Sequence, residues 1–205
     1  MKLPTFRHER ELKKQGYKVV VGVDEVGAGC LAGPVVAVAL ELTMNCRIAG
    51  IADSKLLTAK RRMEIFEKIL KKNIKWAVGM ATAEEIDRIN IRRASKLAMK
   101  RAIESFGTAT YALIDAWQIP DLKIPHHGII KGDLLVKSIA AASIVAKVVR
   151  DFMMQEYEQE YPGYGLAQHK GYGTKVHYDG LASLGPSSLH RKTFIKNLQF
   201  PKLQK

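Results

Sequence analysis

The 205-residue chain carries 33 Lys and Arg against 20 Asp and Glu, giving a formal net charge of +13, and 47% of its residues are hydrophobic. This length suits one domain with a substantial core, and the positive charge favours polyanionic partners without defining a fold. The two cysteines, Cys30 and Cys46, exclude a cysteine metal cluster and fit a reducing compartment.

The N-terminal stretch MKLPTFRHERELKKQGYK lacks the apolar region of a signal peptide. The chain also lacks any run of about 18 apolar residues that could cross a membrane. We therefore expect a cytoplasmic protein that does not act in a membrane.

Residues 18–24 are rich in β-branched side chains and predict a buried strand. Gly27 and Gly29 then allow a tight turn, and residues 34–43 predict a second strand. We expect these strands to pair antiparallel. Cys30 lies beside the glycines, where a small buried hydrophobe is favoured over a redox role.

A helix is predicted over residues 58–72 because its apolar side chains recur on one side. The side chains expected on that side are Met63, Ile65, Phe66, Ile69 and Leu70. A third strand is predicted over residues 75–81. Thr82 and Glu85 then fit a capping box, which opens a helix or helix pair running to about residue 105.

Residues 111–115 (YALID) predict a fourth strand that ends in a carboxylate, and residues 127–131 predict a short fifth strand. Residues 136–158 predict a helix whose first half is small and apolar almost all round, which indicates deep burial. The remaining chain predicts a structured loop over residues 161–173 and two helical segments, roughly 175–183 and 187–196.

These elements predict an α/β protein with a mixed five-stranded sheet flanked by helices and a mostly helical C-terminal extension. We expect residues 1–160 to form the catalytic domain. Residues 161–205 would pack on it and contribute to substrate binding.

Four acids stand out, namely Asp24, Glu25, Asp115 and Asp133. Asp24 and Asp115 each end an apolar strand, and ligands collect at the carboxyl ends of parallel strands. Clustered carboxylates can all ionise only if their negative charge is compensated, and Mg²⁺ or Mn²⁺ can supply the positive charge. Two such ions about 4 Å apart can hydrolyse a phosphodiester. Taken singly, each acid is more readily explained as a cap or turn residue.

Several segments in this order together resemble ribonuclease HII, the type 2 ribonuclease H. They are GVDEVGAGCLAGPVV (22–36), DSKLLTAKRR (53–62), LID (113–115), KGD with SIAAASIVAKVVRD (131–151) and YGLAQHKGYGT (164–174). The resemblance implies a ribonuclease H-like fold. It also implies an endoribonuclease that hydrolyses RNA in RNA–DNA hybrids and incises duplex DNA 5′ to single embedded ribonucleotides.

The resemblance places the four catalytic and metal-binding acids of the family on Asp24, Glu25, Asp115 and Asp133. It implies hydrolysis with two divalent ions, Mg²⁺ or Mn²⁺, which leaves 5′-phosphate and 3′-hydroxyl ends. We expect a monomer.

Recognition of the RNA–DNA junction in the family falls here on the turn Gly27, Ala28 and Gly29 and on Tyr172. Glycines let the backbone approach a 2′-hydroxyl, and a tyrosine ring can stack on the following sugar. Without the resemblance, Tyr172 would be read as a loop-packing aromatic.

This chain departs from the family pattern at three places. Ala28 stands where the family usually has Arg. Asp115 is followed by Ala116 rather than Gly, and Asp133 by Leu134 rather than a polar residue.

Other polar residues are compatible with either substrate binding or structure. Ser54 and Lys55 lie in a loop whose family counterpart approaches the nucleic acid. Ser143, Lys147 and Arg150 share a helix, where they could face a phosphate or tether polar groups in the core. His169 is more readily explained as structural. The remaining basic residues predict a solvated helix face: Lys60, Arg61, Arg62, Lys68, Lys71 and Lys72.

Two alternatives to the enzyme remain open from the sequence, a binding module on the same fold that has lost catalysis and a basic structural or ribosome-associated protein. The last residues, FPKLQK, are too short and generic to read as a docking motif. A contact with a sliding clamp is therefore not readable from the sequence.

Overall fold

The computed structural model describes residues 3–52 and 54–198. Asp53 of the DSKLLTAKRR motif and the terminal FPKLQK lie outside the described residues. Within the described chain, none of the helices is long and apolar enough to cross a membrane.

Five strands form one mixed sheet in the order β3-β2-β1-β4-β5. The strand bounds are β1 (Val20–Val26), β2 (Val35–Leu40), β3 (Trp76–Ala81), β4 (Tyr111–Asp115) and β5 (His126–Ile129). The first three strands pair antiparallel, whereas β4 runs parallel to β1 and β5 parallel to β4. Both the antiparallel β1–β2 pair and the mixed sheet predicted from the sequence are therefore confirmed.

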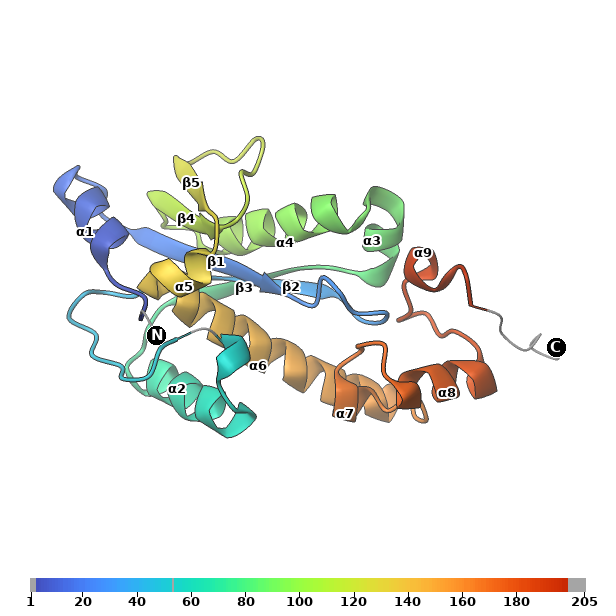
Figure 1. Ribbon diagram of the computed structural model, residues 1–205. Helices are drawn as coiled ribbons and strands as arrows, with labels where there is room; N and C mark the ends of the chain where they lie inside the picture. Colours follow the sequence, from blue (N-terminus) through green and yellow to red (C-terminus); the bar gives the residue numbers. More distant parts are fainter. Residues whose placement is uncertain (1–2, 53, 199–205) are drawn as a thin grey trace.

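Helices cover the two faces of this sheet, as Figure 1 shows. α3 (Ala83–Ile89) and α4 (Ile91–Phe106) pack on one face, and α2 (Ala59–Lys71) and α6 (Lys137–Glu160) on the other. Strand side chains alternate between faces, so each face of the sheet contributes its own apolar layer to the core. The Thr82–Glu85 capping box at the start of α3 is confirmed.

α6 lies close against β1 because Gly22 has no side chain. A Cβ on Gly22 would lie 2.2 Å from the carbonyl carbon of Ser138, closer than packed atoms approach. The following alanines Ala140, Ala141 and Ala142 are fully buried against the sheet. The deep burial predicted for the first half of this helix is therefore confirmed, and the close contact places α6 beside the acids of β1.

Short helices complete the described chain: α1 (Arg7–Lys14), η1 (Ser54–Leu56), α5 (Gly132–Leu135), α7 (Leu166–His169), α8 (Lys175–Leu184) and α9 (Lys192–Ile195). The sequence reading missed α1. Its buried Glu9 accepts a hydrogen bond of 2.9 Å from the backbone N–H of Ser138, so α1 caps the first turn of α6 from outside.

The C-terminal segment packs beside the second half of α6 and the loop between β1 and β2 (Figure 1). The expected helix over residues 187–196 is wrong in its first half, since only α9 is helical. Residues 187–191 instead include a short extended stretch in which Leu189 and Arg191 exchange backbone hydrogen bonds with Gly33 and Leu31. A contact across this separation in sequence is invisible to local patterns.

One apolar residue of α2 also differs from expectation. Ile65 and Ile69 are fully buried as predicted, but Leu70 is 46% exposed because it lies beyond the edge of the apolar stripe.

Candidate active site

Two acidic strand ends lie side by side in the sheet. The parallel register pairs Val23 of β1 with Ile114 of β4, so Asp24 and Asp115 follow directly at the same edge. The prediction that these acids meet at one edge is confirmed. Glu25 follows Asp24 within β1, and the Asp24 carboxylate accepts a 2.8 Å hydrogen bond from the Glu25 N–H.

Asp133 reaches this edge through the turn that precedes α5. Lys131 adopts a left-handed conformation (φ 57°), and the backbone N–H of Gly132 donates a 2.6 Å hydrogen bond to Asp115 Oδ1. A Cβ on Gly132 would lie 2.7 Å from Ile139 Cδ1, so a larger residue here would require the Ile139 side chain to shift. The turn brings Asp133, buried within α5, toward the end of β4.

The acids affect one another electrostatically. Burial, followed by repulsion from Glu25 and Asp115, raises the pKa of Asp24 well above its ordinary value. Burial and repulsion from Asp115 raise the pKa of Glu25 to about 7. The pKa of Asp115 is also raised, by burial and then by Asp133. Carboxylates that oppose each other's ionisation in this way form a site that favours a cation.

A divalent ion fits this donor set by its chemistry. Hard cations prefer carboxylate oxygens, and Glu25 Oε2 is buried without a hydrogen-bond partner in the described structure. Within residues 3–52 and 54–198, however, no three His, Cys, Asp or Glu side chains are grouped closely enough to hold a metal ion as they stand. Asp24, Glu25, Asp115 and Asp133 are the acids that could supply carboxylate oxygens to an ion at this edge of the sheet.

A cavity of about 300 Å³ opens at these acids. Its lining residues are Asp24, Glu25, Val26, Ser54, Lys55, Arg62, Asp115, Ser143, Lys147 and Tyr172. The structure thus brings three of the four acids together with most of the predicted substrate-binding residues. Asp133 and the turn Gly27–Ala28–Gly29 do not line this cavity.

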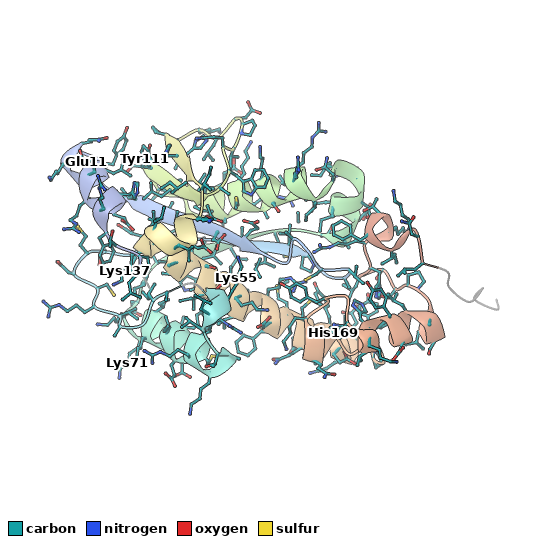
Figure 2. The ribbon with its side chains drawn as sticks, in the orientation of Figure 1. Glu11, Lys55, Lys71, Tyr111, Lys137 and His169 are labelled. Atoms are coloured by element: carbon teal, nitrogen blue, oxygen red, sulfur yellow. The ribbon has the colours of Figure 1, made fainter. Side chains whose placement is uncertain are left out.

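Cations lie around the cavity as well as acids. Lys55 Nζ is 3.9 Å from Asp133 Oδ2, and Figure 2 shows Lys55 beside α6 near the middle of the molecule. Lys147 forms a 2.7 Å ion pair with Asp151 one turn along the helix. A mixture of acids that take a metal and cations that take phosphate suits a phosphodiester substrate.

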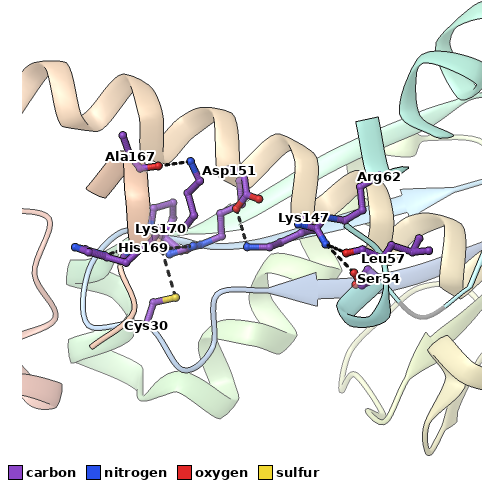
Figure 3. A network of polar contacts seen from close by, with 12 residues as sticks. Cys30, Ser54, Leu57, Arg62, Lys147, Asp151, Ala167, His169 and Lys170 are labelled. Carbon is purple, nitrogen blue, oxygen red and sulfur yellow. Dashed lines mark hydrogen bonds and ion pairs between the residues drawn. The ribbon is translucent and has the colours of Figure 1, made fainter. Parts of the chain in front are cut away.

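Arg62 corrects an expectation from the sequence, which placed it on a solvated helix face. Its guanidinium donates to the carbonyls of Ser54 and Leu57 and lines the cavity (Figure 3). Arg62 therefore holds the loop that carries Lys55, a role that periodicity in α2 could not reveal.

A chain of hydroxyl groups connects this loop to an acid. Ser54 Oγ and Ser143 Oγ are 2.8 Å apart, and hydrogen bonding from Ser143 lowers the pKa of Asp24 against the larger effect of burial. Ser143 and Lys147 both line the cavity, one turn apart on α6. Of the predicted helix trio, only Arg150 faces the core, where it is fully buried.

Gly27, Ala28 and Gly29 form a tight turn immediately after β1. Gly27 has φ 93°, and a Cβ there would lie 2.2 Å from Arg150 Nε. Its carbonyl accepts from the Cys30 N–H and, with the carbonyl of Ala28, from the Arg191 guanidinium. The carbonyls of Gly27 and Ala28 are therefore engaged inside the protein.

Tyr172 is 41% exposed at the rim of the cavity, in the loop after α7. Lys147 Nζ lies 5.8 Å from the centre of its ring, and its backbone N–H donates to the carbonyl of His169. His169 itself is buried with both ring nitrogens hydrogen-bonded within the protein, as its structural reading predicted. The tyrosine ring is thus left accessible beside the acids.

Comparison with known proteins gives a consistent result. The family model described as Ribonuclease HII matches residues 21–200. A curated Ribonuclease HII of Alkaliphilus metalliredigens is 49% identical over 197 residues, which cover 93% of this chain and 96% of that protein. A Ribonuclease HII of Bacillus subtilis is 48% identical over 188 residues, covering 91% and 73% respectively.

Solved structures share the fold. The ribonuclease H2 from Pyrococcus horikoshii superposes with a TM-score of 0.70 at 24% identity, covering 86% of this chain and 93% of that chain. A structure of the PCNA:RNase HII complex from Archaeoglobus fulgidus contains a chain with a TM-score of 0.70 at 26% identity, covering 91% and 98%.

Proposed function

The chain belongs to the ribonuclease HII family of metal-dependent endoribonucleases, and we propose that it incises duplex DNA on the 5′ side of single embedded ribonucleotides as well as cutting RNA–DNA hybrids. The products of this reaction would carry 3′-hydroxyl and 5′-phosphate ends. The observation that carries the proposal is the adjacency of Asp24, Glu25 and Asp115 in one cavity with Tyr172 at its rim.

The catalytic residues of this proposal are Asp24, Glu25, Asp115 and Asp133, which would hold one or two Mg²⁺ or Mn²⁺ ions. Such ions, when bound, activate water and stabilise the leaving oxygen of a phosphodiester. The chain's own contribution is to hold the oxygens in place: the Gly132 N–H orients Asp115, and the nearby Ser143 hydroxyl lowers the pKa of Asp24 and so favours its ionised form. The raised pKa of Glu25 makes metal binding compete with protonation near neutral pH.

Substrate contacts would come from the residues around the cavity. Lys55 and Lys147, which line the cavity, would meet phosphates, and the hydrogen bond between Ser54 and Ser143 would join the loop and the helix that carry them. A net charge of +13 favours rapid encounter with nucleic acid.

Tyr172 and the turn at Gly27, Ala28 and Gly29 would together recognise the ribonucleotide junction. The tyrosine ring is exposed for stacking on a sugar, and the inward carbonyls leave the other side of the turn for a 2′-hydroxyl or phosphate. We further propose that the protein acts as a monomer, with residues 1–160 as catalytic domain and residues 161–205 contributing Tyr172.

A cleavage assay tests this function. Three duplexes are compared with Mg²⁺, with Mn²⁺ and with chelator: an RNA–DNA hybrid, a DNA duplex with one ribonucleotide, and an all-DNA duplex. The proposal expects metal-dependent cutting of the first two and none of the third. Cutting of the hybrid alone would retain the nuclease but refute single-ribonucleotide incision.

A further inference from the structure

Two consecutive C-terminal residues connect to the two proposed junction-recognition elements, which are the Tyr172 loop and the Gly27–Ala28–Gly29 turn. Arg191 contacts the turn directly, and His190 reaches the loop through His177. His190 forms an antiparallel bridge with Ala32, flanked by the backbone hydrogen bonds Gly33 N–H to Leu189 and Arg191 N–H to Leu31, 2.9 Å each. Successive side chains of an extended segment point to opposite sides. His190 therefore reaches the loop of Tyr172, while Arg191 reaches the turn after β1.

Arg191 is fully buried, and its hydrogen bonds go to backbone carbonyls. Nη1 donates to Ala28 across 3.0 Å and Nη2 to Gly27 across 2.8 Å, while Nε and Nη2 both donate to Gly33. One planar guanidinium thus fixes both the beginning and the end of the loop that contains the turn. An ammonium group, which is a point charge, cannot reproduce this fork.

His190 reaches Tyr172 through His177. The backbone N–H of Ser187 donates to His190 Nδ1 across 3.0 Å, so the ring proton of neutral His190 is on Nε2. His190 Nε2 lies 3.0 Å from His177 Nε2, and His177 Nδ1 lies 2.9 Å from the carbonyl of Tyr172. Since a carbonyl only accepts, His177 donates from Nδ1 to Tyr172 and accepts at Nε2 from His190. We call this chain of hydrogen bonds, which runs from Ser187 through His190 and His177 to Tyr172, the histidine relay.

The relay is held in one arrangement by its surroundings. The ring of His169 stacks on that of His177 with ring centroids 4.4 Å apart. The ring of Tyr164 packs at an angle against that of His190, with ring centroids 4.7 Å apart. His177 and His190 are both essentially buried. Burial lowers the pKa of each, that of His190 to about 4, so the relay is neutral at physiological pH.

We propose that His190 and Arg191 are positioning residues that set the Tyr172 loop and the Gly27–Ala28–Gly29 turn relative to each other, and thereby determine selectivity for a single ribonucleotide. This inference rests on the proposed function of Tyr172 and the turn. Because two adjacent residues hold the loop and the turn, replacing either side chain should displace one of these elements relative to the other. A purely structural role would instead affect all substrates alike.

The test is the ratio of two single-turnover rates, for a DNA duplex with one ribonucleotide and for a long RNA–DNA hybrid. Arg191→Lys keeps the charge but loses the fork, and His190→Leu removes the relay. Each is expected to lower the ratio about tenfold or more, because displacement of a binding group by about 1 Å is costly. His190→Gln, which keeps a donor near the position of Nε2, is expected to preserve the ratio.

Two further variants make the test specific. Thr193 lies in the same C-terminal segment, and its hydroxyl donates a 2.6 Å hydrogen bond to Asp87 of α3 rather than to the Tyr172 loop or the turn. Thr193→Val removes this hydrogen bond and should leave the ratio unchanged. In a Tyr172→Ala background, His190→Leu should lower the ratio no further, because the group that it positions is already absent.

The outcomes separate this inference from the proposed function. An unchanged ratio in Tyr172→Ala alone would refute the role of Tyr172, and the inference with it. A lowered ratio in Tyr172→Ala, combined with equal loss on both substrates in folded Arg191→Lys and His190→Leu, would overturn the inference only. If His190→Leu does not fold, His177→Gln replaces it, since Gln loses the donor near Nδ1 that His177→Asn retains.

Discussion

The backbone N–H of Gly132 lies 2.6 Å from Asp115 Oδ1, so the residue that precedes Asp133 is hydrogen-bonded to the acid that ends β4. This contact joins two acids that are distant in sequence into one unit. Asp115 also lines the cavity that Asp24 and Glu25 line. The geometry of the acid cluster therefore depends on a backbone contact as well as on the carboxylates.

Replacing Asp115 by Asn should abolish cleavage without weakening the fold. The amide oxygen can still accept from Gly132, while the charge that raises the pKa of Glu25 is removed. We expect activity to fall by a thousandfold or more, on the order of losses at other catalytic acids, and the metal-free thermal midpoint to stay or rise. Single-turnover cleavage and circular dichroism measure both, and a midpoint lowered by many degrees would mark Asp115 as a structural acid.

The metal-free protein should lose stability as pH rises through neutrality. The pKa of Glu25 is about 7 in the folded protein against an ordinary 4.5, so the folded state binds more protons between these values. Its contribution is present below pH 4.5 and is lost as pH rises through about 7. Thermal midpoints in chelator should therefore fall from pH 5.5 to 8, and Glu25→Gln should flatten this slope.

Divalent ions should reverse that trend, because they bind the ionised carboxylates. With Mn²⁺ present, the stabilisation relative to chelator should grow with pH over the same range. Equal midpoints with Mn²⁺ and with chelator at pH 8 would count against a metal site at these acids.

The histidine relay should make the fold sensitive to acid. The pKa of His190 is lowered from an ordinary 6.5 to about 4 by burial and by the facing His177. A lowered pKa contributes stability that is present above pH 6.5 and is lost as pH falls toward 4. Because Glu25 acts in the opposite direction over part of this range, the measured quantity is the difference in free energy of unfolding between wild type and His190→Gln. Urea unfolding between these pH values should show wild type losing stability relative to His190→Gln as pH falls. An identical decrease in both proteins would contradict the assignment of this effect to His190.

Restoring the usual family residue at position 28 should strengthen nucleic-acid binding. The carbonyl of Ala28 is held by Arg191, so Ala28→Arg should keep the backbone of the turn and add one cation. One added phosphate contact should steepen the slope of log K against log salt by about 0.9. Binding titrations at several salt concentrations measure this, with Ala28→Gln as the uncharged control. Loss of all cleavage in Ala28→Arg would show that the turn does not tolerate the side chain.

Much of the fold could be predicted from local patterns. The fourth strand, residues 111–115, was predicted with its exact bounds because an apolar run ends in a carboxylate, and Thr82 with Glu85 correctly marked the start of a helix. The four acids stood out because they lie at predicted strand ends or beside a glycine turn. The neighbouring positions of Asp24 and Asp115 then followed from the parallel pairing of β1 and β4.

The remaining features depend on contacts between distant segments. Arg150 and Arg191 are charged, so composition predicts exposure, yet backbone carbonyls brought from other loops satisfy them in the core. Residues 187–191 were expected to be helical, and only pairing with residues 31–33 makes them extended. His177 and His190 give no local signal, because their relay exists only after the C-terminal segment has folded against the loop of Tyr172.

The most direct test of the account is an incision assay, mapped at nucleotide resolution, on an end-labelled DNA duplex with one ribonucleotide. Wild type, Asp24→Asn and Asp179→Asn are compared in Mn²⁺, since Asp179 is an exposed acid paired with Lys175 away from the cavity and gives the same change of charge. The account predicts a cut immediately 5′ to the ribonucleotide by wild type and Asp179→Asn, and none by Asp24→Asn. Equal cutting by Asp24→Asn, or no cut by wild type, would contradict it.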